Sequence, residues 1–194
     1  MRSLVRPALA LFGLFTILTG VVYPLAVTGL AQILFPYRAN GSLVRDHGRV
    51  IGSELIGQSF ADPRYFWGRP SATTPYGYNA AASTGSNLGP SNPALKDSVA
   101  ARIAALRAVD PNDTAPVPID LVTMSGSGLD PHISPAAAYF QVPRIARVRG
   151  LAVADLRRLV DDAVEGRTFG ILGEPHVNVL LLNRRLDALR ASPP

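Results

Sequence analysis

A single long stretch without any charged residue, from Pro7 to Tyr37, constrains this chain more than any other feature. A bilayer core is about 30 Å thick and a helix rises about 1.5 Å per residue, so roughly 20 apolar residues span it. The stretch exceeds that length. Inside lipid a backbone must satisfy its own hydrogen bonds, so the segment is expected to be helical. We therefore predict a short terminus at residues 1–7, a transmembrane helix at 8–35 and one soluble domain at 36–194.

The charges that flank the span predict its direction. Arg2 and Arg6 precede it, and positive flanks remain in the cytoplasm. Arg38 and Arg45 follow the span and weaken the asymmetry, but a long domain translocates largely regardless of its charge. The expected location is the inner (plasma) membrane, crossed once, with the N-terminus in the cytoplasm and an extracytoplasmic (periplasmic) domain.

A cleaved signal peptide is the alternative reading of the same segment. Residues 29–31 (GLA) form an acceptable small-residue cleavage site. Apolar regions of signal peptides run about 7–15 residues, however, and residues 8–23 are already longer. We therefore favour a retained anchor. Pro24 and three glycines lie in the span, where membrane helices tolerate them, and they fit either an isolated anchor or a helix–helix contact.

Composition narrows the possible functions of the soluble part. The chain has no cysteine, which excludes disulfides, thiol catalysis and cysteine-based metal sites. The formal net charge is +5 and Lys96 is the only lysine. A basic balance can indicate nucleic acid or anionic lipid. The arginines are scattered among acidic residues and the domain is expected outside the cytoplasm, so we expect contact with membrane lipid and none with nucleic acid.

Hydrophobic periodicity and turn residues predict an α+β fold with one mixed α/β domain. The strongest prediction is an amphipathic helix over residues 93–109, which begins after the capping residue Asn92. Residues 68–90 are rich in turn-forming residues and aromatics, which indicates a long packed loop. The other expected elements are a hairpin within 41–55, a helical turn at 62–67, a strand at 119–124, helices at 135–142, 143–150 and 152–165, a strand at 177–182, and a helix at 184–189 that Asn183 caps.

Several small residue clusters raise the question of chemistry. Ser127, Asp130 and His132 are the residue types of a hydrolase triad, but residues so close in sequence rarely adopt that geometry, and no G-x-S-x-G elbow is present. A turn held by Ser and Asp side chains is the favoured reading. The histidines, His47, His132 and His176, lack metal-ligand spacing. We predict no catalytic and no metal-binding residue.

Two glycine-rich loops are the remaining candidates. Nests of backbone N–H groups bind anions, and both loops have a suitable composition. Neither is a P-loop, because no Gly-Lys-Ser/Thr follows. A binding protein uses such loops for contacts, and the candidate contact residues are Gly85, Ser86, Asn87, Gly89, Ser125, Gly126, Ser127, Gly128 and Asp130.

These loops also carry a family resemblance. Together with the N-terminal span, they resemble the C subunit of the bacterial Kdp potassium-transporting ATPase over nearly the whole chain and in the same order. The matching segments are 65–72 (YFWGRPSA), 83–93 (STGSNLGPSNP), 125–134 (SGSGLDPHIS), 141–144 (QVPR), 172–175 (LGEP) and 177–179 (VNV).

The resemblance implies an accessory subunit of a high-affinity K⁺ import pump. Its partners would be a channel-like subunit that carries the ion, a P-type ATPase subunit that hydrolyses ATP, and a small stabilising peptide. The C subunit of that family holds the complex together and is regarded as a catalytic chaperone that raises the ATP affinity of the ATPase subunit. ATP and K⁺ would therefore be encountered through the complex. The chain itself has no Asp-Lys-Thr-Gly phosphorylation motif, which agrees with a non-catalytic role. The alternative is an independent membrane-anchored envelope binding protein or hydrolase.

Overall fold

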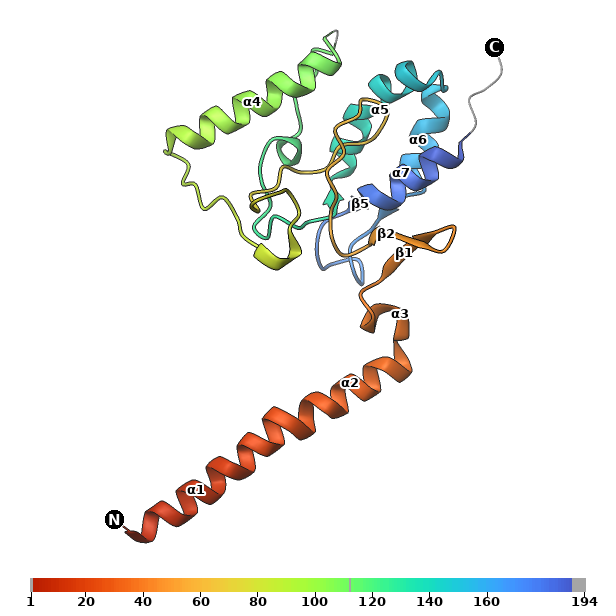
Figure 1. Ribbon diagram of the computed structural model, residues 1–194. Coiled ribbons are helices and arrows are strands. Elements are labelled where there is room, and N and C mark those ends of the chain that lie inside the picture. The colour runs from red at the N-terminus through yellow and green to blue at the C-terminus, as the bar shows by residue number, and fades with distance from the viewer. Residues whose placement is uncertain (1, 112, 190–194) are drawn as a thin grey trace. The chain divides into compact units, whose positions relative to one another are not determined.

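The structure is a computed structural model that describes residues 2–111 and 113–189. The chain divides into two units, Met1–Ile51 and Gly52–Pro194. Figure 1 traces the first unit in red and orange and the second from orange through green to blue.

The first unit is mostly helical. Its helices include one span long and apolar enough to cross a membrane, Leu4–Leu34, and no second such span occurs in the described part of the chain. The predicted hairpin is confirmed: two strands pair across a turn at His47 and Gly48, both with positive φ. The elements are α1 (Arg2–Ile17), the π-helical η1 (Leu18–Val22), α2 (Tyr23–Leu34), α3 (Pro36–Ala39), β1 (Leu43–Asp46) and β2 (Arg49–Ser53).

A π-helical turn interrupts the long apolar span just before Pro24. The backbone N–H of Tyr23 donates to the carbonyl of Leu18, five residues earlier. The hydroxyls of Thr16 and Thr19 donate to carbonyls one turn back, at 2.7 and 2.6 Å. These bonds keep the polar groups of the span satisfied within the helix, as a lipid environment requires.

The second unit contains a small antiparallel sheet in the order β3-β5-β4. Its strands are β3 (His132–Ile133), β4 (Val164–Glu165) and β5 (His176–Asn178). Val177 lies in the central strand opposite both Ile133 and Val164, and it is fully buried. The fold is therefore mixed, as predicted.

Among its described residues, the second unit also has four helices and two short 3-10 turns. They are η2 (Ala80–Ala82), α4 (Pro93–Val109), η3 (Ile119–Leu121), α5 (Pro135–Arg149), α6 (Val153–Asp161) and α7 (Val179–Ala188). The helix predicted at 93–109 has those bounds, and the side chain of Asn92 accepts a hydrogen bond from the N–H of Ala94. Ser134 caps α5 in the same manner, through the N–H of Ala137.

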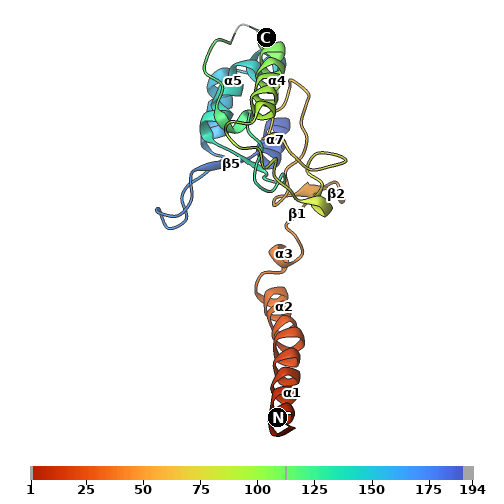
Figure 2. The same ribbon diagram turned by 90° about the vertical axis from the view of Figure 1, so that its left-hand side faces the viewer.

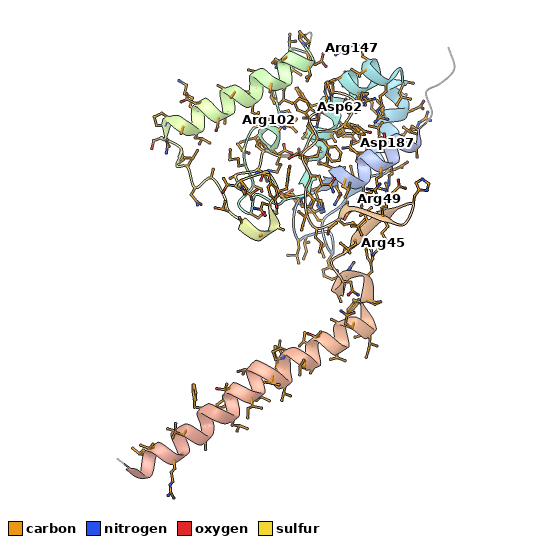
Figure 3. The ribbon with its side chains drawn as sticks, in the orientation of Figure 1. Arg45, Arg49, Asp62, Arg102, Arg147 and Asp187 are labelled. Atoms are coloured by element: carbon orange, nitrogen blue, oxygen red, sulfur yellow. The ribbon has the colours of Figure 1, made fainter. Side chains whose placement is uncertain are left out.

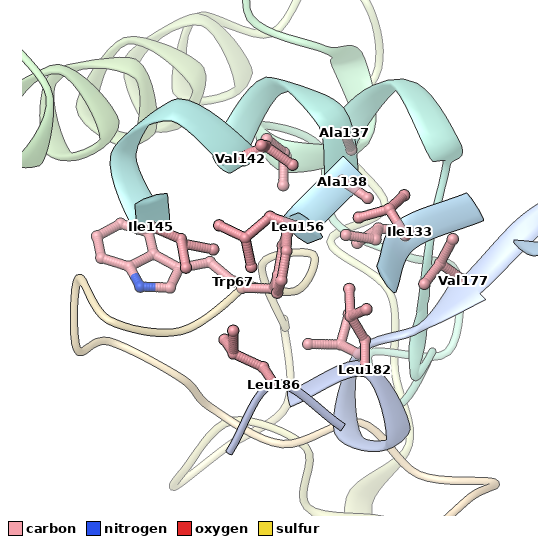
Figure 4. Close-up of a cluster of buried hydrophobic side chains, with 14 of the residues drawn as sticks. Trp67, Ile133, Ala137, Ala138, Val142, Ile145, Leu156, Val177, Leu182 and Leu186 are labelled. Carbon is pink, nitrogen blue, oxygen red and sulfur yellow. The ribbon is translucent and has the colours of Figure 1, made fainter. Parts of the chain in front are cut away.

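The core of the second unit lies between α5, α6, α7 and the sheet (Figure 4). Val142 and Ile145 from α5 meet Leu182 and Leu186 from α7, and all four are fully buried. Trp67 packs into the same cluster from the loop that precedes the first helix of this unit. The core thus holds residues 66–67 in place, where the first glycine-rich loop begins.

Several predicted elements are wrong. Residues 119–124 form no strand: Leu121 is buried in a 3-10 turn, and Asp120 accepts hydrogen bonds from the N–H and hydroxyl of Ser134. By contrast, the single turn predicted at 62–67 is present, and the N–H of Tyr65 closes it by donating to the carbonyl of Asp62.

The helix boundaries also differ from prediction after residue 134. α5 continues through Pro143, because buried residues on both sides, Val142 and Ile145, fix it against the core. α6 ends at Asp161, since Val164 and Glu165 pair with β5.

The apolar run at 177–182 is mostly helix. Asn178, rather than Asn183, caps α7 by accepting a hydrogen bond from the N–H of Leu181. Asn183 lies in the middle of α7, and its side chain is buried in the domain.

Candidate functional site

The two predicted loops meet in the structure. We call residues 83–89 and 125–130 the double-loop platform. The carbonyl of Ser127 accepts from the N–H of Thr84 and from the hydroxyl of Ser83, each at 3.0 Å. Ser71, in the same long loop as Thr84, donates its hydroxyl to the carbonyl of Gly128 at 2.7 Å. One backbone–backbone bond and two bonds from serine hydroxyls to backbone carbonyls therefore join these segments, which are far apart in sequence.

Glycine permits this close approach at two positions. A Cβ on Gly85 would lie 2.9 Å from the carbonyl oxygen of Gly126. Gly128 has φ +68, and a Cβ there would lie 2.7 Å from both the carbonyl oxygen of Thr84 and the Cγ2 of Thr73. Backbone and a β-branched side chain cannot easily move aside, so both glycines are required by the contact between the loops.

This arrangement gives a matched pair of substitutions. Gly128→Ala is expected to destabilise the domain by about 2 kcal/mol, from the left-handed backbone and the collision with Thr84. Gly126→Ala, two residues away, places its Cβ where no atom lies within 4 Å, so little change is expected. Thermal unfolding of the two full-length variants in detergent measures the difference. Equal unfolding midpoints would show that the loops are not locked at Gly128.

Arg69 holds the second loop of the platform, residues 125–130, through its guanidinium group. Its guanidinium donates to the carbonyls of Thr123 and Met124 and forms an ion pair with Asp130 at 3.2 Å. Burial alone would raise the pKa of Asp130, but hydrogen bonds from His132 and the charge of Arg69 outweigh it and lower the pKa. Asp130 is thus an ionised structural residue of the platform.

Three backbone N–H donors of the platform are engaged within the platform itself. The N–H of Gly128 donates to the hydroxyl of Ser125 at 2.9 Å, and that of Leu129 donates to the hydroxyl of Ser127 at 3.1 Å. The N–H of Thr84 is likewise engaged with the second loop. An anion that used these three N–H groups would have to displace their present bonds. The ligand of the platform stays a prediction.

The predicted contact residues differ in exposure. Ser125 and Gly128 are buried and serve the lock between the loops. Gly85, Ser86 and Asp130 are partly buried. Asn87, Gly89, Gly126 and Ser127 are exposed and form the outer surface of the platform. Beside them lies an open hollow of about 410 Å³, lined in part by Leu55, Leu129 and Pro131.

The residue types of a hydrolase triad are present without the geometry. The hydroxyl of Ser127 accepts from its own loop, and Asp130 accepts from Arg69 and from the N–H of His132. The ring of His132 lies with its Nδ1 3.4 Å from Asp130 Oδ1, and it also packs edge-on against His176, with ring centroids 4.4 Å apart. The antiparallel pairing of β3 and β5 brings these two histidines together. No three His, Asp or Glu side chains in the described residues are arranged to hold a metal ion.

The sequence did not predict the side chains that hold residues 66–67, where the first loop begins. Gln141 accepts from the N–H of Trp67 and donates to its carbonyl, at 2.8 and 3.1 Å. Asn183 makes the same pair of bonds with Phe66, at 2.9 and 3.0 Å. The two buried side-chain amides therefore make the backbone hydrogen bonds to residues 66–67 that a neighbouring β-strand would otherwise make. We call Gln141 and Asn183 the amide clamp.

Two arginines complete this support at the ring of Trp67. The guanidinium of Arg102 lies 5.1 Å from the Trp67 ring and that of Arg144 lies 5.2 Å from it. Arg102, on α4 (Figure 3), donates to the carbonyls of Gly68 and Leu121. Arginine stems pack readily on apolar surface, and Arg102 is such a case. In the sequence, the only signal that an arginine would stack on an aromatic ring was the presence of Trp67.

Tyr78 fixes the middle of the first loop. Its hydroxyl donates to the carbonyl of Arg69 at 2.5 Å. Burial raises the pKa of the Tyr78 phenol to about 12, so the donor proton is retained at neutral pH. The prediction of a packed loop is correct for Trp67 and Tyr78, whereas Tyr76 is exposed.

Comparison with known proteins identifies the family. The family model "KdpC: K+-transporting ATPase, c chain" matches residues 5–188. The chain belongs to the KdpC family. A potassium-transporting ATPase KdpC subunit of Sorangium cellulosum is 63% identical over 190 residues, which is 98% of this chain and 100% of that protein. KdpC subunits of Methylococcus capsulatus and Polaromonas naphthalenivorans are each 62% identical, over 95% and 98% of this chain and 97% of each relative.

Membership of the KdpC family confirms the resemblance read from the motifs. It makes the chain a subunit of a K⁺-transporting P-type ATPase complex, with a role in potassium import. The alternative of an independent envelope hydrolase or binding protein is therefore wrong. The matched region takes in nearly all of the apolar span and both loops of the platform.

Proposed function

We propose that this chain is a non-catalytic subunit that holds a channel-like subunit, a P-type ATPase subunit and a small stabilising peptide together. The observation that carries the proposal is the family match over residues 5–188, which takes in the membrane span and the domain alike. The local bonding of the platform supports it, because Ser127 and Asp130 are engaged in bonds that stabilise the loops. Such a surface is suited to rigid protein contact.

We propose further that the chain lies in the inner membrane, with its N-terminus in the cytoplasm and the domain outside. Arg2 and Arg6 before the span support this direction. The absence of cysteine permits a direct test with single cysteines at Ser3 and Ser86. A membrane-impermeant maleimide should label intact spheroplasts only through Ser86→Cys. Labelling only through Ser3→Cys would reverse the topology.

A domain outside the cytoplasm has a consequence for the effect on ATP. It cannot touch cytoplasmic ATP, so any increase in the ATP affinity of the ATPase subunit is transmitted through the membrane helices of the assembled complex. The π turn before Pro24 supports a contact of this span with other helices, since such turns are common at functional positions. The chain then acts as a catalytic chaperone without binding nucleotide itself.

The test compares the complex purified with and without this chain. Without it, we expect less of the ATPase subunit to copurify with the channel-like subunit, and the assembled remainder to show a higher KM for ATP. The same yield and the same KM would contradict the proposal. An unchanged KM with poor assembly would retain the assembly role and remove the chaperone role.

Glu174 provides a prediction about direct ATP contact. This exposed carboxylate accepts two hydrogen bonds from Arg167, at 2.8 and 2.7 Å, and it would repel phosphate. Glu174→Gln should leave both assembly and the KM for ATP unchanged, because an exposed ion pair contributes less than about 1 kcal/mol. Copurification of the subunits with the Glu174→Gln chain measures this. A complex that falls apart would refute the prediction.

A further inference from the structure

An apolar tip projects from the hairpin that connects β4 to β5. We call residues 166–175 the apolar finger. Phe169 is 88% exposed, Ile171 74% and Leu172 57%. Large apolar side chains scattered singly over a surface are ordinary, but three within four residues at the end of one hairpin form a patch. Figure 2 shows this blue segment reaching beyond β5, away from the helices of the domain.

The described residues of the domain leave much of the finger uncovered. Gly166, Gly170 and Gly173 are spread along it, and a Cβ at any of the three would have no atom within 4 Å. The apolar side chains at the tip therefore remain exposed to water in the isolated chain. Burial of such side chains is favourable by about 25 cal/mol per Å², so the exposure costs free energy that a partner would recover.

The finger is nevertheless held in one conformation. Thr168 and Leu172 exchange backbone hydrogen bonds at 2.8 and 3.0 Å, which closes a three-residue turn. The ion pair of Arg167 and Glu174 joins the two sides below it. Phe169 adopts φ +54, a left-handed conformation that is costly for a bulky residue. Strain of about 1–3 kcal/mol at an exposed apolar residue is a feature of functional positions.

We propose that the apolar finger inserts Phe169 and Ile171 into a preformed apolar hole on another subunit of the same transport complex. This inference rests on the proposed function, since it names a contact through which the chain would hold its partners. A rigid aromatic side chain flanked by aliphatic ones is typical of the residues that dominate binding energy at interfaces. Because the turn is already formed, little conformational entropy is lost on docking.

The charges around the finger favour a protein over the lipid surface. Segments that bind anionic membranes carry unpaired lysines and arginines, often with tryptophan or tyrosine. Residues 165–175 contain one arginine and two glutamates, and neither lysine, tryptophan nor tyrosine. The arginine is paired with Glu174. The base of the finger thus has no net positive charge to attract phospholipid headgroups.

The first test removes the apolar tip and leaves the turn. The double substitution Phe169→Ser with Ile171→Ser in the full chain should reduce copurification of the other subunits at least about tenfold, a loss of roughly 1.4 kcal/mol or more. Ile119→Ser is the matched control, because Ile119 is also 74% exposed but lies far along the chain. The pair Phe169→Leu with Ile171→Val should retain assembly. Normal assembly by the double serine variant would overturn the inference.

A fluorescence measurement keeps the inference testable if the serine variant folds poorly. Phe169→Trp adds one tryptophan to the buried Trp67, and its emission should shift to the blue only when the complex forms. No shift on assembly would contradict the insertion. A shift in nanodiscs without partners, quenched by brominated lipid, would assign the finger to the bilayer. A shift that grows with concentration of the chain alone would assign it to self-association. Either result overturns the proposal.

Failure of this inference differs from failure of the proposed function. If the unmodified chain copurifies with no other subunit, the assembly role itself is wrong. If the unmodified chain assembles and the double serine variant assembles equally well, the assembly role stands and the contact lies elsewhere, with the exposed surface of the double-loop platform as the next candidate.

Discussion

Replacing Gln141 with leucine is expected to destabilise the folded domain by about 3 kcal/mol. The substitution keeps the size of a buried side chain and removes its two hydrogen bonds to Trp67. Each buried backbone group left without a partner costs about 1–3 kcal/mol, and the added apolar contact offsets only part of this. For a domain of this size, that corresponds to a midpoint of thermal unfolding lowered by about 10 °C.

Asn183→Leu is expected to have a similar effect, since it strips the same two groups from Phe66. The two amides hold neighbouring residues of one segment, so the double variant should lose less than the sum of the single losses. Circular dichroism melting of the full chain in detergent measures all three variants.

The control for the amide clamp is Arg158→Leu. Arg158 is exposed, and its ion pair with Asp155 spans 3.6 Å, so this change of a polar residue to leucine should cost less than about 1 kcal/mol. If Gln141→Leu melted within about 2 °C of the unmodified chain, water would be replacing the amide, and the segment at 66–67 would not depend on the clamp.

Arg144→Met is expected to be the second large effect, a loss of about 3 kcal/mol. Arg144 is buried and donates to the carbonyls of Pro63 and Tyr65 and to the side chain of Gln141. Methionine fills much of the same volume and removes the cost of a buried charge. It also leaves the partly buried carbonyls of Pro63 and Tyr65 without this donor, takes one of two donors from Gln141 Oε1, and removes the cation from the ring of Trp67. The unpaired acceptors outweigh the relief, because each costs about 1–3 kcal/mol.

The charge state of Arg144 supports this account. Burial lowers the pKa of its guanidinium to about 10, yet the group stays protonated at pH 7 and donates all three bonds. Arg144→Lys should rescue little, since an ammonium cannot reach three acceptors with the geometry of a planar fork.

Arg157→Met tests the specificity of the effect of Arg144. Arg157 is exposed and lies 5.9 Å from the ring of Tyr139, an arrangement that contributes about 0.5–1 kcal/mol at the surface. Thermal melting of the two methionine variants side by side measures the difference. A more stable Arg144→Met chain would mean that the buried charge is a net cost that the hydrogen bonds do not repay.

Elements with strong local signals were predictable from the sequence. The helix at 93–109 has a capping Asn92, a proline in its first turn and apolar residues at helical spacing, and its bounds are correct. The hairpin within 41–55 is correct because an alternating pattern flanks a short turn at His47 and Gly48, which both have positive φ.

Elements decided by tertiary contacts were not predictable. The run at 177–182 is apolar except for Asn178 and suits a strand or a buried helix equally. The cap formed by Asn178 begins helix α7 after two residues. Pro143 suggests a helix boundary by local rules, but packing of Val142 and Ile145 carries α5 through it. A stretch such as 119–124 reads as a strand, yet no strand in the described chain pairs with it.

The candidate site shows the same division. The glycines and serines of the two loops were recognisable by composition, and their contact across the chain gives a physical reason for Gly85 and Gly128. The role of the side chains that hold the start of the first loop could not be predicted from the sequence. Gln141 and Asn183 are polar residues on otherwise ordinary helices, and only the structure shows that Phe66 and Trp67 lack a partner strand.

The central claim is that this chain works as a member of a potassium-transporting complex, and purification of the tagged full-length chain in mild detergent tests it most directly. The proteins recovered are identified by mass spectrometry. We predict that a P-type ATPase and a channel-like membrane protein are recovered with it. A monodisperse chain that carries no other protein, obtained from cells expressing the whole transport system, would contradict the claim.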